Sequence, residues 1–244
     1  MGREEKMTST KFVPAKICWL AYICACTSVY VTFHYPLVAD QFWNGFAAHM
    51  VSTVVIWIFS CTYSNTSIYD PFWCYMPLAI SIGWMATNAA SSVSTRSCVA
   101  FVLLLVWCVR YARQFPWTGW FTGLHHEDWR YVQIAKQTGS GTVLYWFASL
   151  ISLHLTPTCL VFAGLSPMER EFSRTAATSI PINNIDVAGV VVCVTAIAIQ
   201  HFADTTLFQF RTKVYGTNTG LDYKSTSKKI CTAGLWRWSR HPNY

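Results

Sequence analysis

Six long apolar stretches constrain the fold of this 244-residue sequence more than any other feature. Each approaches the roughly 17–25 apolar residues that a helix needs to cross the hydrocarbon core of a bilayer. The third and fourth are short, so one of them is a candidate for a broken or re-entrant element rather than a full span. In chain order they are Ile17 to Phe33, Phe46 to Thr62, Tyr75 to Ala90, Ser97 to Tyr111, Val143 to Ala163 and Asp186 to Ala203. They predict an all-α, polytopic transmembrane helix bundle of about six spans.

The composition agrees with a membrane protein and excludes several other classes. Only 12% of the residues are charged, about half the fraction of roughly 25% in soluble domains. The net charge of +7 is scattered through polar connections, so we exclude nucleic acid as a partner. Most of the ten Cys lie in apolar runs, and no Cys or His has the spacing of zinc ligands. We therefore predict buried thiols and no metal site.

The distribution of Lys and Arg predicts the orientation in the membrane, because cytoplasmic loops are enriched in positive residues. An N-terminus in the cytosol places most cations on that side, together with three polar connections: 63–74, 114–142 and 204–244. We expect a cytosolic segment at 1–16, followed by one membrane domain at 17–244. The endoplasmic reticulum is the default membrane, since the N-terminus has no transit-type pattern.

The last eleven residues, from Gly234 to Tyr244, concentrate polar and aromatic groups. The planar guanidinium of Arg suits phosphate, the Trp and Tyr faces suit stacking on a flat ring, and Asn can pair with an amide. These groups together match the needs of a dinucleotide. The alternative is a juxtamembrane anchor, in which Trp lies at the interface and Arg contacts lipid headgroups. Composition alone leaves both interpretations open.

Four segments of the sequence resemble one family in the same order along the chain. GLWRWSRHPNY resembles the GLWRYSRHPNY-type signature of the steroid 5-alpha-reductase superfamily, and more narrowly of its branch catalogued as a domain of unknown function. Asn65 to Trp73 resembles the SIYDPYW stretch of that branch, His126 to Tyr131 its GEDWRY stretch, and Ala203 to Arg211 its ADxQxxxFR helix end. The related families are the sterol reductases and the isoprenylcysteine carboxyl methyltransferases.

The resemblance implies a membrane helix bundle with an NADPH site that opens to the cytosol. It assigns the cofactor to the residues that match the signature and to the helix end before it: Arg211, Trp236, Arg237, Arg240, His241, Asn243 and Tyr244. A reductase also needs a proton donor, for which we select Tyr69 and Asp70. Structural alternatives exist, because Asp70 precedes Pro71 as a helix cap would, and Glu127-Asp128 could pair with Arg130.

Asp204 lies at the end of an apolar stretch, where an ionisable residue is costly unless it is paired. Arg211 is two helical turns further on and would share its face in a continuous helix. The sequence departs from the branch at Gln200, where a Glu is usual, and near Thr206, where a Gln is usual. Family members also continue beyond the equivalent of Tyr244, so we expect a C-terminally truncated chain with low turnover if nothing follows.

Three functions are compatible with these features. The first is a membrane-embedded, NADPH-dependent reductase of a lipid that enters from the bilayer. The second is an S-adenosylmethionine-dependent methyltransferase, because the isoprenylcysteine enzymes carry a related RHPxY signature. The third is a non-catalytic membrane protein. The substrate, whether sterol, steroid, enoyl chain or polyprenol, and the oligomeric state are not specified by the sequence.

Overall fold

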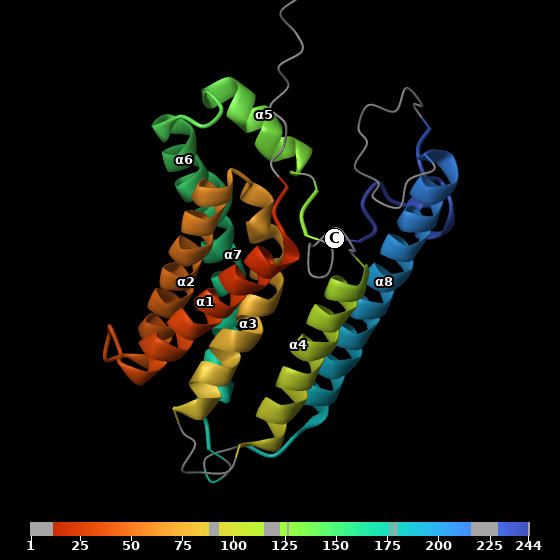
Figure 1. Ribbon diagram of the computed structural model, residues 1–244. Helices are drawn as coiled ribbons and strands as arrows, with labels where there is room; N and C mark the ends of the chain where they lie inside the picture. The colour runs from red at the N-terminus through yellow and green to blue at the C-terminus, as the bar shows by residue number, and fades with distance from the viewer. Residues whose placement is uncertain are drawn as a thin grey trace, which may run out of the picture. The chain divides into compact units, whose positions relative to one another are not determined.

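The computed structural model describes residues 12–87, 93–114, 123–125, 127–175, 177, 180–215 and 229–243. Within these ranges the secondary structure consists of helices and two isolated β-bridges, which confirms the predicted all-α class. The elements are α1 (Ala15–His34), α2 (Gln41–Tyr63), η1 (Thr66–Ile68), α3 (Tyr69–Ala86), α4 (Thr95–Gln114), α5 (Trp129–Thr138), α6 (Val143–Ser149), η3 (Leu150–Leu155), α7 (Thr156–Phe172), α8 (Asn184–Tyr215) and η5 (Gly234–Arg237) (Figure 1).

Five helical segments of the described chain are long and apolar enough to cross a membrane. They are Ala15–His34, Gln41–Tyr63, Thr95–Ala112, Val143–Phe172 and Asn184–Val214. The third stretch expected from the sequence belongs to α3, which starts at Tyr69 rather than Tyr75 and includes Asp70 and Pro77. Such residues make α3 less apolar, and it is not among the five segments.

The chain divides into two compact units. The first contains Met1–Cys98 and Trp117–Ser179, and the second contains Val99–Pro116 and Ile180–Tyr244. In the first unit α1, α2, α3 and α7 pack together around buried aromatic side chains, which include Tyr69, Phe72 and Trp84 (Figure 1). In the second unit α4 and α8 lie side by side and run in the same direction (Figure 1).

The longest span of the first unit, Val143–Phe172, contains a π-helical segment from Leu150 to Leu155. Pro157 follows this segment and has no N–H with which to continue an α-helical ladder. Two carbonyl groups of this region lie within hydrogen-bond distance of side chains: Thr156 Oγ1 donates to Ile151 O at 2.8 Å, and His154 Nδ1 lies 2.9 Å from Ser149 O. These side chains therefore add hydrogen bonds to the backbone of the wider turn inside an apolar span.

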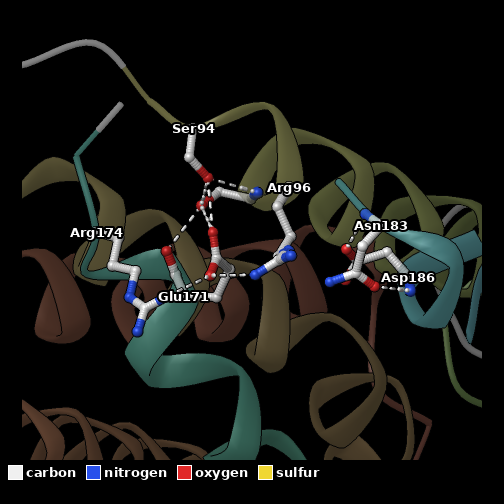
Figure 2. Close-up of polar contacts among 7 residues, drawn as sticks. Ser94, Arg96, Glu171, Arg174, Asn183 and Asp186 are labelled. Carbon is white, nitrogen blue, oxygen red and sulfur yellow. Dashed lines mark hydrogen bonds and ion pairs between the residues drawn. The ribbon is translucent and has the colours of Figure 1, made fainter. Parts of the chain in front are cut away.

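Glu171, at the end of α7, is the centre of a polar cluster that joins this helix to the start of α4 (Figure 2). Its Oε1 accepts from Ser94 Oγ at 2.7 Å, and its carboxylate lies 3.9 Å from Arg96 and 3.5 Å from Arg174. Ser94 Oγ also accepts from the backbone N–H of Ser97 at 3.0 Å, as an N-cap residue does. The cluster fixes where α4 begins.

Asn183 and Asp186 begin α8 with a reciprocal capping arrangement (Figure 2). Asn183 Oδ1 accepts from the N–H of Ile185 at 2.8 Å, and Asp186 Oδ2 accepts from the N–H of Asn183 at 2.8 Å. The helix then continues for 32 residues to Tyr215, beyond the expected end at Ala203. Asp204 is therefore an interior residue of a continuous helix.

The close approach of α2 and α3 depends on Gly45. A Cβ at this position would lie 2.7 Å from the indole Nε1 of Trp84, whose side chain is fully buried. We expect Gly45→Ala to lower the free energy of unfolding by about 1–3 kcal/mol, as overpacked cores do. The control is Gly164→Ala in α7, where a Cβ meets nothing within 4 Å. Thermal unfolding in detergent should show the first variant destabilised and the second unchanged or slightly stabilised. Equal melting temperatures would contradict this packing.

Candidate functional site

Two of the polar motifs found in the sequence lie against each other in the first unit. The N–H of Thr66 donates to Glu127 Oε1 at 2.7 Å, and the N–H of Asp128 donates to Ser67 Oγ at 2.9 Å. One turn further on, Tyr131 Oη donates to Asp70 Oδ1 at 2.7 Å. Each pair is separated by 61 residues, so the two segments run in parallel and in constant register. His126 lies outside the described residues.

Glu127 and Asp128 both have structural partners. Glu127 accepts from the first N–H of η1, and Asp128 caps α5 by accepting from the N–H of Arg130 at 2.9 Å. The Asp128 carboxylate also receives two hydrogen bonds from the Arg130 guanidinium, at 2.8 and 3.0 Å. The expected pairing with Arg130 therefore holds for Asp128 and not for Glu127.

Tyr69, the first candidate proton donor, lies inside the helix bundle with only 2% of its surface exposed. Its hydroxyl is 2.8 Å from Thr158 Oγ1, which is itself 2.9 Å from Thr53 Oγ1. The ring of His154 stands edge-on to it at 5.0 Å between centroids. Burial raises the pKa of the Tyr69 hydroxyl well above its usual range. The group is protonated and occupied by a buried hydrogen-bond chain.

Asp70, the second candidate, is also buried, in the first turn of α3. Burial raises the pKa of its carboxyl to about 7, although hydrogen bonds from Tyr131 and Ser67 act in the opposite direction. Burial also raises the pKa of Glu127. The Asp70 carboxyl is therefore largely protonated at pH values below about 7.

A buried ion pair organises the second unit. Arg110 Nη1 donates to Asp204 Oδ2 at 2.8 Å, and the side chains of both residues are only 8% exposed. Gln200 Oε1 accepts from Arg110 Nη2 and from Trp107 Nε1, each at 3.2 Å. Asp204 is thus paired with Arg110 of α4 and not with Arg211, the residue two turns further along its own helix.

The C-terminal signature segment binds to this ion pair and to the helix around it. Asn243 Nδ2 donates to Asp204 Oδ1 at 2.8 Å, and Gln200 Nε2 donates to Asn243 O at 3.3 Å. The indole Nε1 of Trp236 donates to the carbonyl of Ala203 at 2.8 Å, which lies in the last α8 turn before Asp204. These contacts hold both ends of segment 236–243 against α8.

The segment and α8 together form an open pocket of about 720 Å³. Its walls contain four cations and two indole rings: Arg211, Lys229, Arg237, Arg240, Trp236 and Trp238. The described residues that line it include no Asp or Glu. The guanidinium of Arg237 also lies 5.8 Å from the ring centre of Trp238. A flexible anion with a flat ring fits this combination of charge and aromatic surface.

The expected cofactor residues divide into three groups in the structure. Four of them line the pocket together: Arg211, Trp236, Arg237 and Arg240. His241 and Asn243 do not line it, and the Asn243 amide is used by Asp204. Tyr244 lies outside the described residues. The candidate proton donors, Tyr69 and Asp70, belong to the first unit.

Sequence reasoning missed Arg110, Lys229 and Trp238. Arg110 had a detectable signal, because an arginine within the apolar run from Ser97 to Tyr111 needs a buried partner, and Asp204 needs one too. Trp238 lies in the segment whose Trp faces suit stacking, although it was not selected, whereas Lys229 had no signal because the pocket forms only when the chain after α8 folds back on that helix.

The five long apolar helices and the all-helical fold of the described residues place this chain in the class of polytopic integral membrane proteins. Residues 56–244 match the model of a family described as protein of unknown function (DUF1295), and the chain belongs to this family. No curated protein and no solved structure matches the chain.

The raised pKa of Asp70 makes stability depend on pH. In the folded chain the Asp70 carboxyl keeps its proton up to its pKa of about 7. In the unfolded chain an Asp carboxyl releases this proton at about pH 4. The unfolding free energy should therefore fall as pH rises from about 4 to about 7 and then become level, with Glu127 acting in the same direction. Melting temperatures in detergent would test this. Asp70→Asn should flatten the profile, and an unchanged slope in that variant would contradict the assignment.

The Arg110–Asp204 pair provides a second test. Asp204→Asn should cost about 3–5 kcal/mol of stability, because it leaves a buried guanidinium without its counter-charge. The double variant Arg110→Met/Asp204→Leu removes both charges and should recover most of that loss. Thermal unfolding reports the stability, and limited proteolysis after Trp236 or Arg237 reports release of the C-terminal segment. A double variant no more stable than Asp204→Asn would show that the pair is not the cause.

Proposed function

We propose that this protein is a membrane-embedded, NADPH-dependent reductase of a lipid. The observation that carries the proposal is the pocket of about 720 Å³ lined by Arg211, Arg237, Arg240, Trp236 and Trp238. This volume lies within the range of about 300–1,000 Å³ that is usual for ligand sites. The proposal also rests on the resemblance of segment 234–244 to the steroid 5-alpha-reductase signature, since membership of the family alone assigns no activity.

The described residues of the pocket fit the chemistry of NADPH. The three arginines would bind its phosphate groups through charge-assisted hydrogen bonds, which are about twice as strong as neutral ones. Trp236 and Trp238 offer flat faces to its rings. NADPH, when bound, supplies the hydride that reduces a double bond. The hydrogen bonds from Trp236 to Ala203 and from Asn243 to Asp204 hold the C-terminal segment, and with it the nucleotide, against α8.

The proton required by such a reduction needs a separate donor. Asp70 suits this role better than Tyr69, because a general acid works best when its pKa lies near the working pH. Tyr69 holds its proton too firmly, because burial raises the pKa of its hydroxyl well above the usual range. We propose in addition that the pocket faces the cytosol, as the distribution of Lys and Arg favours, and that the membrane is the endoplasmic reticulum.

Titration of the full chain in detergent with NADPH, NADH and S-adenosylmethionine tests the proposal. Saturable NADPH binding is expected, and Arg240→Ala should weaken it by about 10–100-fold, since a hydrogen bond to a charged group is worth about 1.5–3 kcal/mol. Lys136→Gln, an exposed cation of α5 in the first unit, is the control and should leave the affinity unchanged.

Each other outcome overturns the proposal in a different way. Binding of S-adenosylmethionine alone would identify a methyltransferase, whose family carries a related RHPxY signature. Binding of none of the three would identify a non-catalytic membrane protein. NADPH binding that survives Arg240→Ala unchanged would place the nucleotide away from this pocket.

A further inference from the structure

The length of α8 places the start of its polar end close to the membrane surface. From Val187 to Ala203 the helix contains no Asp, Glu, Lys or Arg. These residues span about 26 Å at a rise of about 1.5 Å per residue, close to the hydrocarbon thickness of about 30 Å. The helix continues for twelve residues, Asp204–Tyr215, which carry Arg211 and Lys213. The turns that follow Asp204 therefore lie at the depth of the lipid headgroups.

The segment after α8 is held at this same depth. Trp236 donates to the carbonyl of Ala203, and Asn243 donates to Asp204. A Cβ on Gly234 would lie 3.5 Å from Thr206 Oγ1, so the start of η5 is also close to α8. Residues 229–243 thus lie beside the first turns that emerge from the hydrocarbon core.

The surface formed there is both basic and apolar. The described residues after Asp204, at 205–215 and 229–243, include five cations and no Asp or Glu. Two large apolar side chains are almost fully exposed among them: Trp238 at 83% and Ile230 at 77%. Exposed Trp and Ile beside Lys and Arg are unfavourable in water and favourable at a membrane interface, where the rings enter the headgroup layer.

We propose that this basic surface, formed by Arg211, Lys213, Lys229, Ile230, Arg237, Trp238 and Arg240, binds anionic phospholipid headgroups of the membrane that α8 crosses. Charge complementarity identifies the occupant, because five cations without a carboxylate gain little from a zwitterionic headgroup and much from an anionic one. Trp238 and Ile230 supply the apolar contact that a soluble anion would not need. Six of these seven residues, all but Lys213, also line the pocket described above, so lipid headgroups and the nucleotide would compete for the same cations.

Lipid selectivity of the full chain in nanodiscs tests this surface. Phosphatidylserine and phosphatidylcholine, each spin-labelled on the acyl chain, report by electron paramagnetic resonance the fraction of lipid held by the protein. At low salt we expect phosphatidylserine to be held about fivefold more strongly than phosphatidylcholine. This factor corresponds to about 1 kcal/mol, the contribution of about one cation close to an anionic headgroup. The preference should approach one in about 1 M salt, where the screening length is about 3 Å.

The variant Lys213→Gln/Arg237→Gln/Arg240→Gln should lose the preference, and Ile230→Ser/Trp238→Ser should reduce it. The matched control Lys16→Gln/Lys136→Gln, which changes two exposed cations of the first unit, should keep it. The amount of phosphatidylcholine held by each variant reports whether the bundle is intact. If a variant fails to fold, the salt dependence of the unmodified chain decides. No preference at low salt, or a preference that survives in the triple variant, would overturn the proposal, whatever the outcome of the NADPH titration.

Discussion

The ion pair between Arg110 and Asp204 determines how the second unit is built. Two charges on neighbouring apolar helices must satisfy each other, because neither can reach bulk water at low cost. The pair also has a second consequence, since the other oxygen of Asp204 accepts from Asn243. One carboxylate therefore joins α4 to α8 and attaches the C-terminal segment to both. The position of the pocket cations follows from this attachment.

The first unit meets the same requirement with hydrogen bonds in place of an ion pair. Segment 65–70 interrupts the apolar pattern after α2, and its exposed backbone groups would be costly inside a bundle. Glu127 accepts the backbone N–H of Thr66, and in the same register the N–H of Asp128 and the hydroxyl of Tyr131 donate to the side chains of Ser67 and Asp70. The two polar motifs are therefore partners in one structure, which explains why each contains carboxylates in a chain with so few charges. Asp70 keeps its raised pKa because this structure excludes water from it.

Much of the fold was predictable because the length of an apolar run is itself a structural constraint. The all-α class and the places of α1, α2 and α8 follow from it. Lateral contacts do not, since they depend on which faces meet: the Arg110–Asp204 pair, the Asn243 contact and the π segment before Pro157 appear only in the structure. Arg211, Trp236, Arg237 and Arg240 were predictable as a group because the resemblance to the family signature, and to the helix end before it, assigned them together. The role of Asn243 was not, because its partner lies 39 residues away.

The proposed nucleotide site is formed by the C-terminal segment and α8 together. Hydrogen–deuterium exchange of the full chain, with and without NADPH, tests it most directly. We predict that NADPH slows exchange in peptides that cover 207–211 and 234–240, both of which contribute to the pocket, and leaves peptides of α2 unchanged. Protection confined to other parts of the chain, such as 66–70 and 127–131, would contradict the claim.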